Sequence, residues 1–432
     1  MLCTSWGMYP EIECRRLLFE RESDLVDIMH SNDEMIPRGN GRSYGDSALG
    51  RSLIEVVPHD CFLGFDREQG ILHIQAGALL SGILEVFVPR GWFLSVTPGT
   101  KLITVGGAIA SDVHGKNHHV AGCFSSCVVE FRMMTPDGEV LTCSSGMNSE
   151  LFHATCGGMG LTGVILDAKI RMKRIHSVHV EQTTIKTKDL SETFEAFKEY
   201  REVPYSVAWI DCLASGPELG RALLMTGDFA DDGDLCYRPS RRPGVPFNLP
   251  SCMLNSRTVR AFNGLYYGRI RRRISRSRVD LDTFFYPLDA VDHWNRIYGR
   301  NGFTQYQFIL PMEMSYKGLS QILDTISASG KGSFLAVLKL YGPANDNYLS
   351  FPLEGYSLAL DFKIEPGLFS LLDRLDELVL DHGGRIYLAK DVRVRRNTFE
   401  KGYPMIDRFR RFRKENGMDR TFRSLQSERV GI

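Results

Sequence analysis

Residues 36–50 read IPRGNGRSYGDSALG and contain four glycines, two arginines and one tyrosine. Glycine lets the backbone approach a ligand closely, so that several N–H groups can converge on an anion. Gly39, Gly41 and Gly45 are spaced G-x-G-x-x-x-G, which differs from the Rossmann fingerprint, and no Lys-Ser or Lys-Thr pair follows to make a Walker loop. The stretch therefore predicts either a pyrophosphate-binding loop of another type or a purely structural glycine turn.

Two more segments are rich in small residues. Residues 97–122 read TPGTKLITVGGAIASDVHGKNHHVAG, and residues 156–165 read CGGMGLTGVI. Small side chains at such density indicate close contact with a large, flat ligand. Three such segments within the first 165 residues favour one long ligand that touches all of them, and a flavin dinucleotide is long enough.

Length and composition limit the possible classes of protein. The 432 residues are enough for two or three domains of ~100 to 200 residues each. The formal net charge is +0, so we expect no nucleic-acid partner. The amino terminus has no signal-peptide pattern, and no apolar run reaches the ~18 residues that a membrane span needs. These features predict a cytoplasmic protein.

The ten cysteines show no metal-binding or disulfide pattern. The closest pair, Cys123 and Cys127, has no second pair to complete a zinc site, so we expect no metal. We interpret all ten as reduced thiols.

Apolar periodicity predicts an irregular mixture of helices and strands. Residues 21–30 are predicted to form a helix, residues 71–88 a strand followed by a helix, and residues 127–143 a hairpin around Pro-Asp-Gly. Residues 151–170 run from a helix through glycines into a strand. Because no regular βαβ rhythm appears, the fold class is α+β.

Two segments in the second half stand out. Residues 238–251 carry four prolines and predict a mobile loop. Residues 269–278, RIRRRISRSR, contain six arginines. This arm is either a solvated basic face or a contact for anionic lipid headgroups or a phosphorylated substrate, and we expect it to be mobile.

The motifs RGNGRSYGD, TVGGAIASDVHGKNHH and GGMGLTG resemble the FAD-binding domain of the vanillyl-alcohol-oxidase family, also called the PCMH type. Within that family they are most similar to the decaprenylphosphoryl-β-D-ribose 2′-oxidases. FYPLDAVDHWNRIYG, QYQFILP, VLKLYG, LSFPLEGYSLALDF and GGRIYLAKD follow in the same order as in those oxidases. The resemblance covers nearly the whole chain.

The resemblance implies a two-domain α+β fold. The FAD-binding domain would span residues 1–175. A substrate (cap) domain, built on an antiparallel sheet with helices, would span residues 176–385. Residues 386–432 would return to the FAD domain.

The resemblance also implies the site residues. The catalytic pair would be Lys390 and His114, and the substrate contacts Tyr306, Gln307, Lys339 and Lys390. The FAD contacts would be Pro37, Arg38, Gly39, Asn40, Gly41, Arg42, Ser43, Tyr44, Gly45, Asp46, Ser47, Gly99, Thr104, Val105, Gly106, Gly107, Ser111, Asp112, Val113, His114, Ile165 and Tyr387. Without the resemblance, His114 could equally be a core histidine and Lys339 a surface lysine.

The function implied is oxidation of a secondary sugar hydroxyl, the 2′-OH of a polyprenylphosphoryl pentose, by hydride transfer to FAD, with Lys390 as base. A short-chain reductase would then reduce the ketosugar product in cell-wall or polysaccharide biosynthesis. FAD would be noncovalent, because Arg42 stands where tethering oxidases carry histidine. Ala359 replaces a cysteine of the family. The protein would be cytoplasmic, with peripheral contact at the inner face of the membrane.

Two alternatives remain. The first is an alditol or sugar-lactone oxidase that uses oxygen. The second is a flavin-binding structural subunit of a polysaccharide-synthesis complex, with no turnover of its own.

Overall fold

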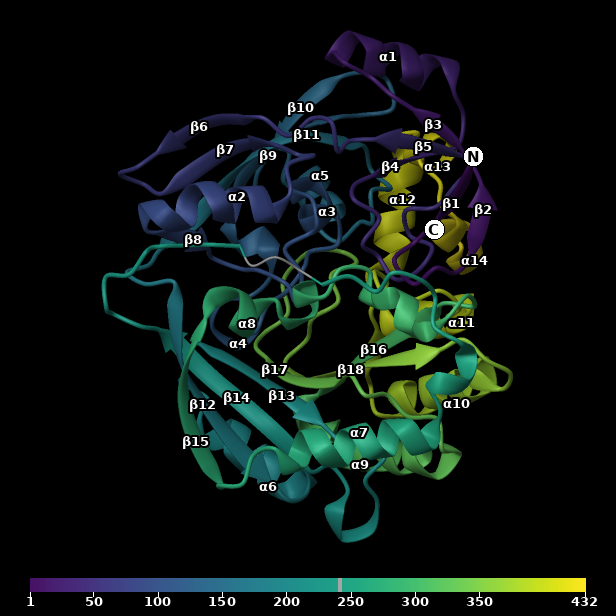
Figure 1. The fold of residues 1–432 in the computed structure, drawn as a ribbon. Coiled ribbons are helices and arrows are strands. Elements are labelled where there is room, and N and C mark those ends of the chain that lie inside the picture. The colour runs from purple at the N-terminus through teal and green to yellow at the C-terminus, as the bar shows by residue number, and fades with distance from the viewer. Residues whose placement is uncertain (240–242) are drawn as a thin grey trace.

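A computed structural model describes residues 1–239 and 243–432. Two groups of β-sheets lie one above the other, with loops from both at their junction (Figure 1). The amino-terminal half supplies the upper group and residues 179–386 supply most of the lower one.

The upper half contains three sheets. The strands β1 (Leu2–Thr4) and β2 (Glu11–Glu13) form a hairpin. A parallel sheet has the order β3 (Arg15–Leu17), β5 (Ser52–Glu55), β4 (Met35–Arg38), and α1 (Glu22–Ser31) connects β3 to β4. An antiparallel sheet has the order β10 (Val140–Cys143), β9 (Val128–Met134), β11 (Val164–Arg174), β7 (Ile71–Gln75), β6 (Phe62–Asp66), with β8 (Trp92–Leu94) also paired to β11.

The helices of this half are short. They are α2 (Leu80–Phe87), α3 (Val105–Ala110), α4 (His118–Ala121) and α5 (Ser149–Thr155). The apolar residues of α2 recur at helical spacing, so that Leu80, Ile83, Leu84 and Phe87 are all buried. This packing fixes the loops that follow α2.

The lower half is one eight-stranded antiparallel sheet. Its order is β15 (Ile274–Asp280), β12 (His179–Thr187), β14 (Ala222–Phe229), β13 (Tyr205–Ile210), β17 (Ala336–Tyr341), β18 (Gly355–Lys363), β16 (Phe303–Pro311), β19 (Arg385–Ile386). One face packs on α6 (Leu190–Glu199), α9 (Met312–Ser329) and α10 (Leu368–Asp381). The other face is turned toward the upper half, and α8 (Leu281–Phe285) lies between the two (Figure 1). Helix α7 (Ser256–Gly268) lies low in that view, near α9, and the 3-10 helices η5 (Pro287–Ala290) and η6 (Trp294–Tyr298) follow α8 in the chain.

The carboxy-terminal helices return to the amino-terminal strands (Figure 1). They are α12 (Ile406–Glu415), α13 (Met418–Thr421) and α14 (Leu425–Val430), whereas α11 (Arg396–Gly402) packs against α10 and β19 of the lower half. Phe422 pairs with Met35 of β4, and Arg429 donates to Asp46 at 2.7 Å. Domain boundaries at residues 175 and 385 stay a prediction.

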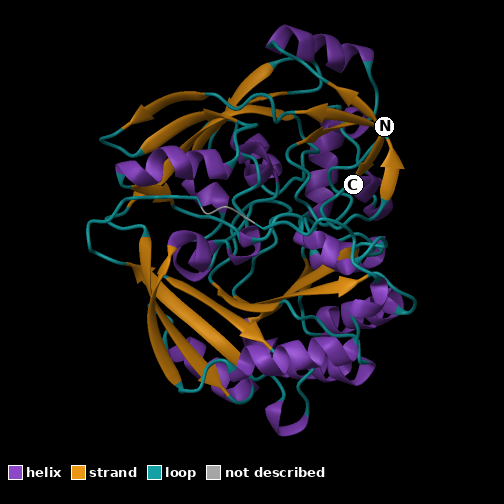
Figure 2. Ribbon diagram, in the orientation of Figure 1, coloured by secondary structure: helices purple, strands orange, loops and turns teal. Residues whose placement is uncertain are grey.

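The mixture of helices and antiparallel sheets confirms the α+β class (Figure 2). The predicted helix is α1, and the predicted hairpin is β9 and β10 in antiparallel register. The expectation of a mobile arginine arm is wrong for Ile274–Asp280, because this segment pairs along its length with β12. Residues 240–242 of the predicted proline-rich loop lie outside the described residues, while Val245 and Leu249 donate backbone hydrogen bonds to Asp292 and Arg296.

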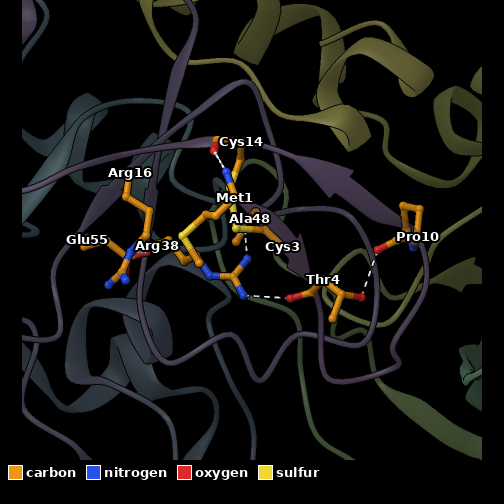
Figure 3. The surroundings of a disulfide bond; sticks show 9 residues. All are labelled: Met1, Cys3, Thr4, Pro10, Cys14, Arg16, Arg38, Ala48 and Glu55. Atoms are coloured by element: carbon orange, nitrogen blue, oxygen red, sulfur yellow. Dashed lines mark hydrogen bonds and ion pairs between the residues drawn. A yellow bond between two sulfur atoms is a disulfide. The ribbon is translucent and has the colours of Figure 1, made fainter.

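The prediction of ten reduced cysteines is also wrong. Cys3 and Cys14 form a disulfide across the β1–β2 hairpin, with 6.3 Å between their Cα atoms (Figure 3). The pairing of Leu2 with Glu13 brings the two cysteines together, and their separation of 11 residues carries no recognisable motif. The other eight are free. Within residues 1–239 and 243–432, no helix is long and apolar enough to cross a bilayer.

Candidate active site

A cavity of about 870 Å³ lies at the junction of the two halves. Its upper wall consists of the glycine-rich loops, and its lower wall is the inner face of the eight-stranded sheet. Residues 387–390, which follow β19, close one end. The three small-residue segments of the sequence therefore do meet at one cavity.

The upper wall is made largely of backbone. Gly41 has a φ of +61°, which favours glycine, and a Cβ on Gly39 would lie 2.4 Å from the Thr104 hydroxyl oxygen. Thr104 caps α3 by accepting a hydrogen bond from the Gly107 N–H at 3.1 Å. The first and second loops thus pack against each other at Gly39, where the Thr104 side chain leaves no room for a Cβ.

Most of the residues predicted to contact the cofactor are in this wall. They are Pro37, Gly39, Asn40, Gly41, Arg42, Ser43, Tyr44, Ser47, Gly99, Thr104, Gly106, Gly107, Ser111, Val113, His114, Ile165 and Tyr387. Such a wall fits a long planar cofactor with a pyrophosphate, because it offers backbone N–H groups, one guanidinium at Arg42 and little side-chain bulk.

Five predicted cofactor contacts lie behind the wall instead: Arg38, Gly45, Asp46, Val105 and Asp112. Arg38 donates to the carbonyls of Thr4 and Ala48 (Figure 3), and Asp46 is paired with Arg429. Gly45 packs directly on the carbonyl of Asp391. Val105 is a core residue, and Asp112 accepts hydrogen bonds from Asn345, Asn347 and Ser350. These residues support the loops and do not reach the cavity.

Gln307 of the lower wall meets His114 of the upper wall in the cavity. The Gln307 amide nitrogen lies 3.2 Å from His114 Nε2 and 3.3 Å from the Ser357 hydroxyl. Burial, and then the charge of Lys339, hold the pKa of His114 well below its usual value. His114 is therefore a neutral imidazole that accepts from Gln307 at Nε2, while its buried Nδ1 has no partner among the described residues.

Tyr387 supports this pair from the end of the cavity. Its N–H donates to the Gln307 carbonyl at 2.9 Å, and its hydroxyl donates to the Ser111 carbonyl at 2.9 Å. Its ring lies 5.1 Å from that of His114. Tyr387 thereby connects β16 of the lower half with the loop after α3 of the upper half.

Lys390 follows three residues later, with its ammonium nitrogen 3.8 Å from the centre of the Tyr44 ring. Burial lowers the pKa of Lys390 to about 7, although the carboxylate of Asp361 acts in the opposite direction. Asp361 is itself buried, and accepts from Gln305 at 2.6 Å. Lys390 can therefore lose its proton near neutral pH.

Two further lysines line the cavity. Burial lowers the pKa of Lys339 to about 8 and that of Lys116 to about 7. The Lys116 ammonium donates to the Phe284 carbonyl and lies 4.5 Å from the centre of the Phe284 ring.

Tyr306 does not reach the cavity, so the expectation that it contacts substrate does not hold. It precedes Gln307 on β16, and successive side chains of a strand point to opposite faces. Its hydroxyl donates to Asp376 of α10 at 3.0 Å, on the far side of the sheet. The Gln307 side chain thus faces the cavity, whereas the Tyr306 side chain faces α10.

Sequence reasoning missed Lys116 and Asp289, which both line the cavity. Lys116 belongs to the same HGKN motif as His114, and this closeness in sequence could have identified it as a cavity residue. Asp289 accepts from the Thr100 hydroxyl and the Lys101 N–H, each at 2.8 Å, and so fixes the turn at Gly99. No sequence motif marks it.

Comparison with known proteins agrees with this geometry. A family described as "FAD binding domain" matches residues 19–144. The decaprenylphosphoryl-beta-D-ribose oxidase of Mycolicibacterium smegmatis is 37% identical over 415 residues, which cover 92% of this chain and 89% of that protein. The chain belongs to the decaprenylphosphoryl-β-D-ribose oxidase family. It is therefore an FAD-dependent oxidoreductase, and the alternative of a structural subunit without turnover is wrong.

Two other relatives are informative. An uncharacterized protein in the mprA 5′ region of Streptomyces coelicolor is 31% identical over 369 residues, 82% of this chain and 100% of that protein. The L-gulonolactone oxidase of Scyliorhinus torazame is 26% identical over 183 residues, 41% of each chain. Similarity to the family thus extends over both halves, whereas similarity to this lactone oxidase covers less than half of the chain.

Proposed function

We propose that the protein oxidises the 2′-hydroxyl of a polyprenylphosphoryl pentose to a ketosugar. The observation that carries this proposal is the position of Lys390, whose pKa is about 7, in the same cavity as Gln307 and the glycine-rich wall. Family membership and the oxidation of decaprenylphosphoryl ribose in the name of the Mycolicibacterium relative support the choice of substrate.

FAD, when bound, supplies the hydride acceptor at N5 of its ring. Neutral Lys390 takes the proton of the sugar hydroxyl as the carbinol hydrogen leaves with its electron pair. Gln307, held by His114 and Ser357, orients the sugar, and Lys339 offers positive charge beside it. His114 stays neutral, since burial and the neighbouring lysine oppose its protonation. The carbonyl product then suits a short-chain reductase, which would complete an epimerisation in cell-wall or polysaccharide biosynthesis.

An anaerobic titration tests the substrate. We expect a polyprenylphosphoryl pentose to bleach the flavin absorbance, and alditols and sugar lactones to leave it unchanged. Bleaching by a lactone but by no lipid-linked sugar would contradict the proposal and favour an oxygen-using lactone oxidase, the function that similarity to L-gulonolactone oxidase supports.

We further propose that FAD is held without a covalent bond. Arg42 stands at the loop position where a tethering histidine would be needed, and a guanidinium remains protonated and is a poor nucleophile. Its guanidinium carbon lies 4.0 Å from the centre of the Trp6 ring. Acid precipitation should leave yellow flavin in the supernatant. A coloured pellet that fluoresces on a denaturing gel would contradict this.

We also expect the protein to act at the inner face of a membrane. A polyprenylphosphoryl substrate resides in a bilayer, and the arginines of residues 269–278 suit anionic headgroups.

A further inference from the structure

The cavity is far longer than a sugar. Its lower wall includes residues from β16, β18, β17, β13, β14, β12 and β15, which are consecutive neighbours in the sheet. Seven strands give six spacings, so the wall extends about 29 Å across the sheet at ~4.8 Å between strands. A pentose at Gln307 leaves most of this length to another part of the substrate.

The chemistry of the wall changes in order along this length. Gln307 on β16 is followed by Lys339 on β17, and then by Trp209 on β13 and Met225 on β14. An amide is thus followed by a cation and then by an apolar stretch on β13 and β14, and the wall becomes polar again beyond it, with Gln182 and Thr184 on β12 and Ser275 and Ser277 on β15. A polyprenylphosphoryl sugar presents its groups in the same order, namely hydroxyls, phosphodiester and isoprenoid chain.

Helix α7 lies over the apolar stretch. The Tyr266 ring is 4.8 Å from that of Trp209, and the Phe262 ring is 5.6 Å from that of Phe334. Asn263 anchors the helix by donating to the buried Asp211 at 2.8 Å. The inner side of α7 therefore forms a roof for the apolar end of the cavity.

The outer side of α7 is exposed and carries apolar side chains among basic ones. Leu265 is 77% exposed, and Ala261, one turn before it, is exposed too. Arg257 and Arg260, also exposed, flank these two residues. Met253, just before the helix, is 52% exposed. Exposed apolar side chains between arginines suit the interface of a bilayer.

Strand β15 continues this surface at the edge of the sheet (Figure 1). Ser275 and Ser277 face the cavity, while Arg276 between them is exposed. Residues 243–279 contain eight arginines and no Asp, Glu or Lys, although the whole chain has a net charge of +0. Arg271, Arg272 and Arg273 are exposed and form no ion pair among the described residues.

We propose that the α7–β15 surface, residues 253–278, docks on an anionic phospholipid bilayer, and that the cavity beneath it takes the isoprenoid chain of the substrate directly from that bilayer. The occupant is a bilayer because charge and exposed apolar side chains coincide here, on the outer side of the helix that covers the apolar stretch. The second part rests on the proposed function, whereas docking does not.

Vesicle sedimentation tests docking without any turnover. We compare vesicles of phosphatidylcholine alone with vesicles that also contain phosphatidylglycerol. The variant Arg271→Glu/Arg272→Glu/Arg273→Glu should bind the anionic vesicles on the order of 100-fold more weakly, since each basic residue near such a surface contributes about fivefold. Its matched control is Arg411→Glu/Lys414→Glu/Arg420→Glu, three exposed cations on α12 and α13, far from α7 in Figure 1.

Leu265→Ser is a second variant that keeps all charges. It should weaken vesicle binding several-fold, and high salt should release the wild-type protein. Equal binding of wild type to neutral and anionic vesicles, or equal losses in the two triple variants, would overturn docking.

Steady-state kinetics test whether the cavity takes the isoprenoid chain of the substrate from the bilayer. With substrate embedded in anionic vesicles, the Arg271/Arg272/Arg273 variant should lose at least tenfold in kcat/KM, while it should reduce its flavin normally with a soluble short-chain polyprenylphosphoryl pentose. An equal kcat/KM for short-chain and long-chain substrates in wild type would overturn the role of the apolar stretch. Failure of both substrates to bleach the flavin would instead contradict the proposed function and leave the vesicle result standing.

Discussion

The two walls of the cavity are built in opposite ways. The upper wall consists of closely packed loops, as where the Gly39 backbone lies against the Thr104 side chain, and it presents N–H groups and flat surface. The lower wall is a regular sheet that presents side chains, among them Gln307 and Lys339. The first arrangement suits a cofactor that never changes. The second suits a substrate, whose identity can be altered by exchanging single side chains.

This difference predicts different responses to substitution. A side chain added to the upper wall at Gly39 or Gly106 should impair cofactor binding, because Thr104 and Ala76 already occupy the space there. A side chain removed from the lower wall should leave the cofactor in place and impair chemistry. The following substitutions test this comparison.

Lys390→Ala should have the largest effect. Loss of a positioned base costs about 100- to 10,000-fold in rate, so stopped-flow reduction of the flavin by substrate should slow by that factor, with FAD still bound. Lys401→Ala, a change at an exposed lysine, is the matched control. Near-normal reduction in Lys390→Ala would place the base elsewhere.

Gly39→Ala addresses the upper wall. The new methyl group would lie 2.4 Å from the Thr104 oxygen, and overpacking of this kind costs about 1 to 3 kcal/mol. We expect FAD affinity, measured by flavin release during dialysis, to fall by up to about 100-fold. Gly82→Ala, where a Cβ has no neighbour within 4 Å, should retain FAD. Equal retention by both variants would contradict a close-packed upper wall.

The two walls also differ in how far the sequence predicted them. The meeting of three glycine-rich segments at one ligand cavity was predictable from their small residues, such as Gly106 and Gly107, although the individual cofactor contacts came from the family resemblance. The lower wall was predicted only through the family resemblance. Tyr306 and Gln307 are neighbours in one strand, and nothing local in a strand buried on both faces indicates which of them faces the cavity. The five supporting residues behind the upper wall show the same limit, since a motif contains both contacts and their supports.

Other features depend on long-range contacts. Asp289 contacts Thr100 and Lys101 across almost two hundred positions of sequence, and the disulfide of Cys3 and Cys14 depends on a hairpin of three-residue strands. The α+β class and the helix at residues 21–30 needed only local periodicity, which is why those predictions are confirmed. Helices α9 and α10 were not predicted.

Gln307→Leu removes an amide from the lower wall. His114 Nε2 would lose its donor, and the sugar would lose an orienting group, which together cost about 1 to 3 kcal/mol. We expect kcat/KM to fall about 30-fold, with the visible spectrum of bound FAD retained. Loss of FAD together with activity would mean that Gln307 belongs functionally to the upper wall.

The pH dependence follows from Lys390. Burial lowers its pKa to about 7, and only the neutral amine accepts a proton. The rate of flavin reduction should therefore rise about tenfold per pH unit below pH ~7 and become constant above it. Measurement between pH ~5.5 and ~8.5 by stopped flow checks the sign. A rate that falls as the pH rises would mean that the lysine acts as a cation.

Tyr306→Phe should have the smallest effect on catalysis, and it separates the two faces of one strand. The hydroxyl donates to Asp376 at 3.0 Å behind the sheet, where Arg393 also pairs with Asp376. Losing one of these two partners should cost about 1 kcal/mol of the free energy of unfolding, measured by denaturant titration. The kcat, the KM and the pH profile of flavin reduction should equal those of wild type, because the phenyl ring keeps its place and Gln307 keeps its contacts.

A raised KM in Tyr306→Phe, with unfolding unchanged, would instead place the hydroxyl in contact with substrate. That result would mean that the sheet presents both of its faces to the reaction, and the contrast between neighbouring residues of β16 would no longer hold.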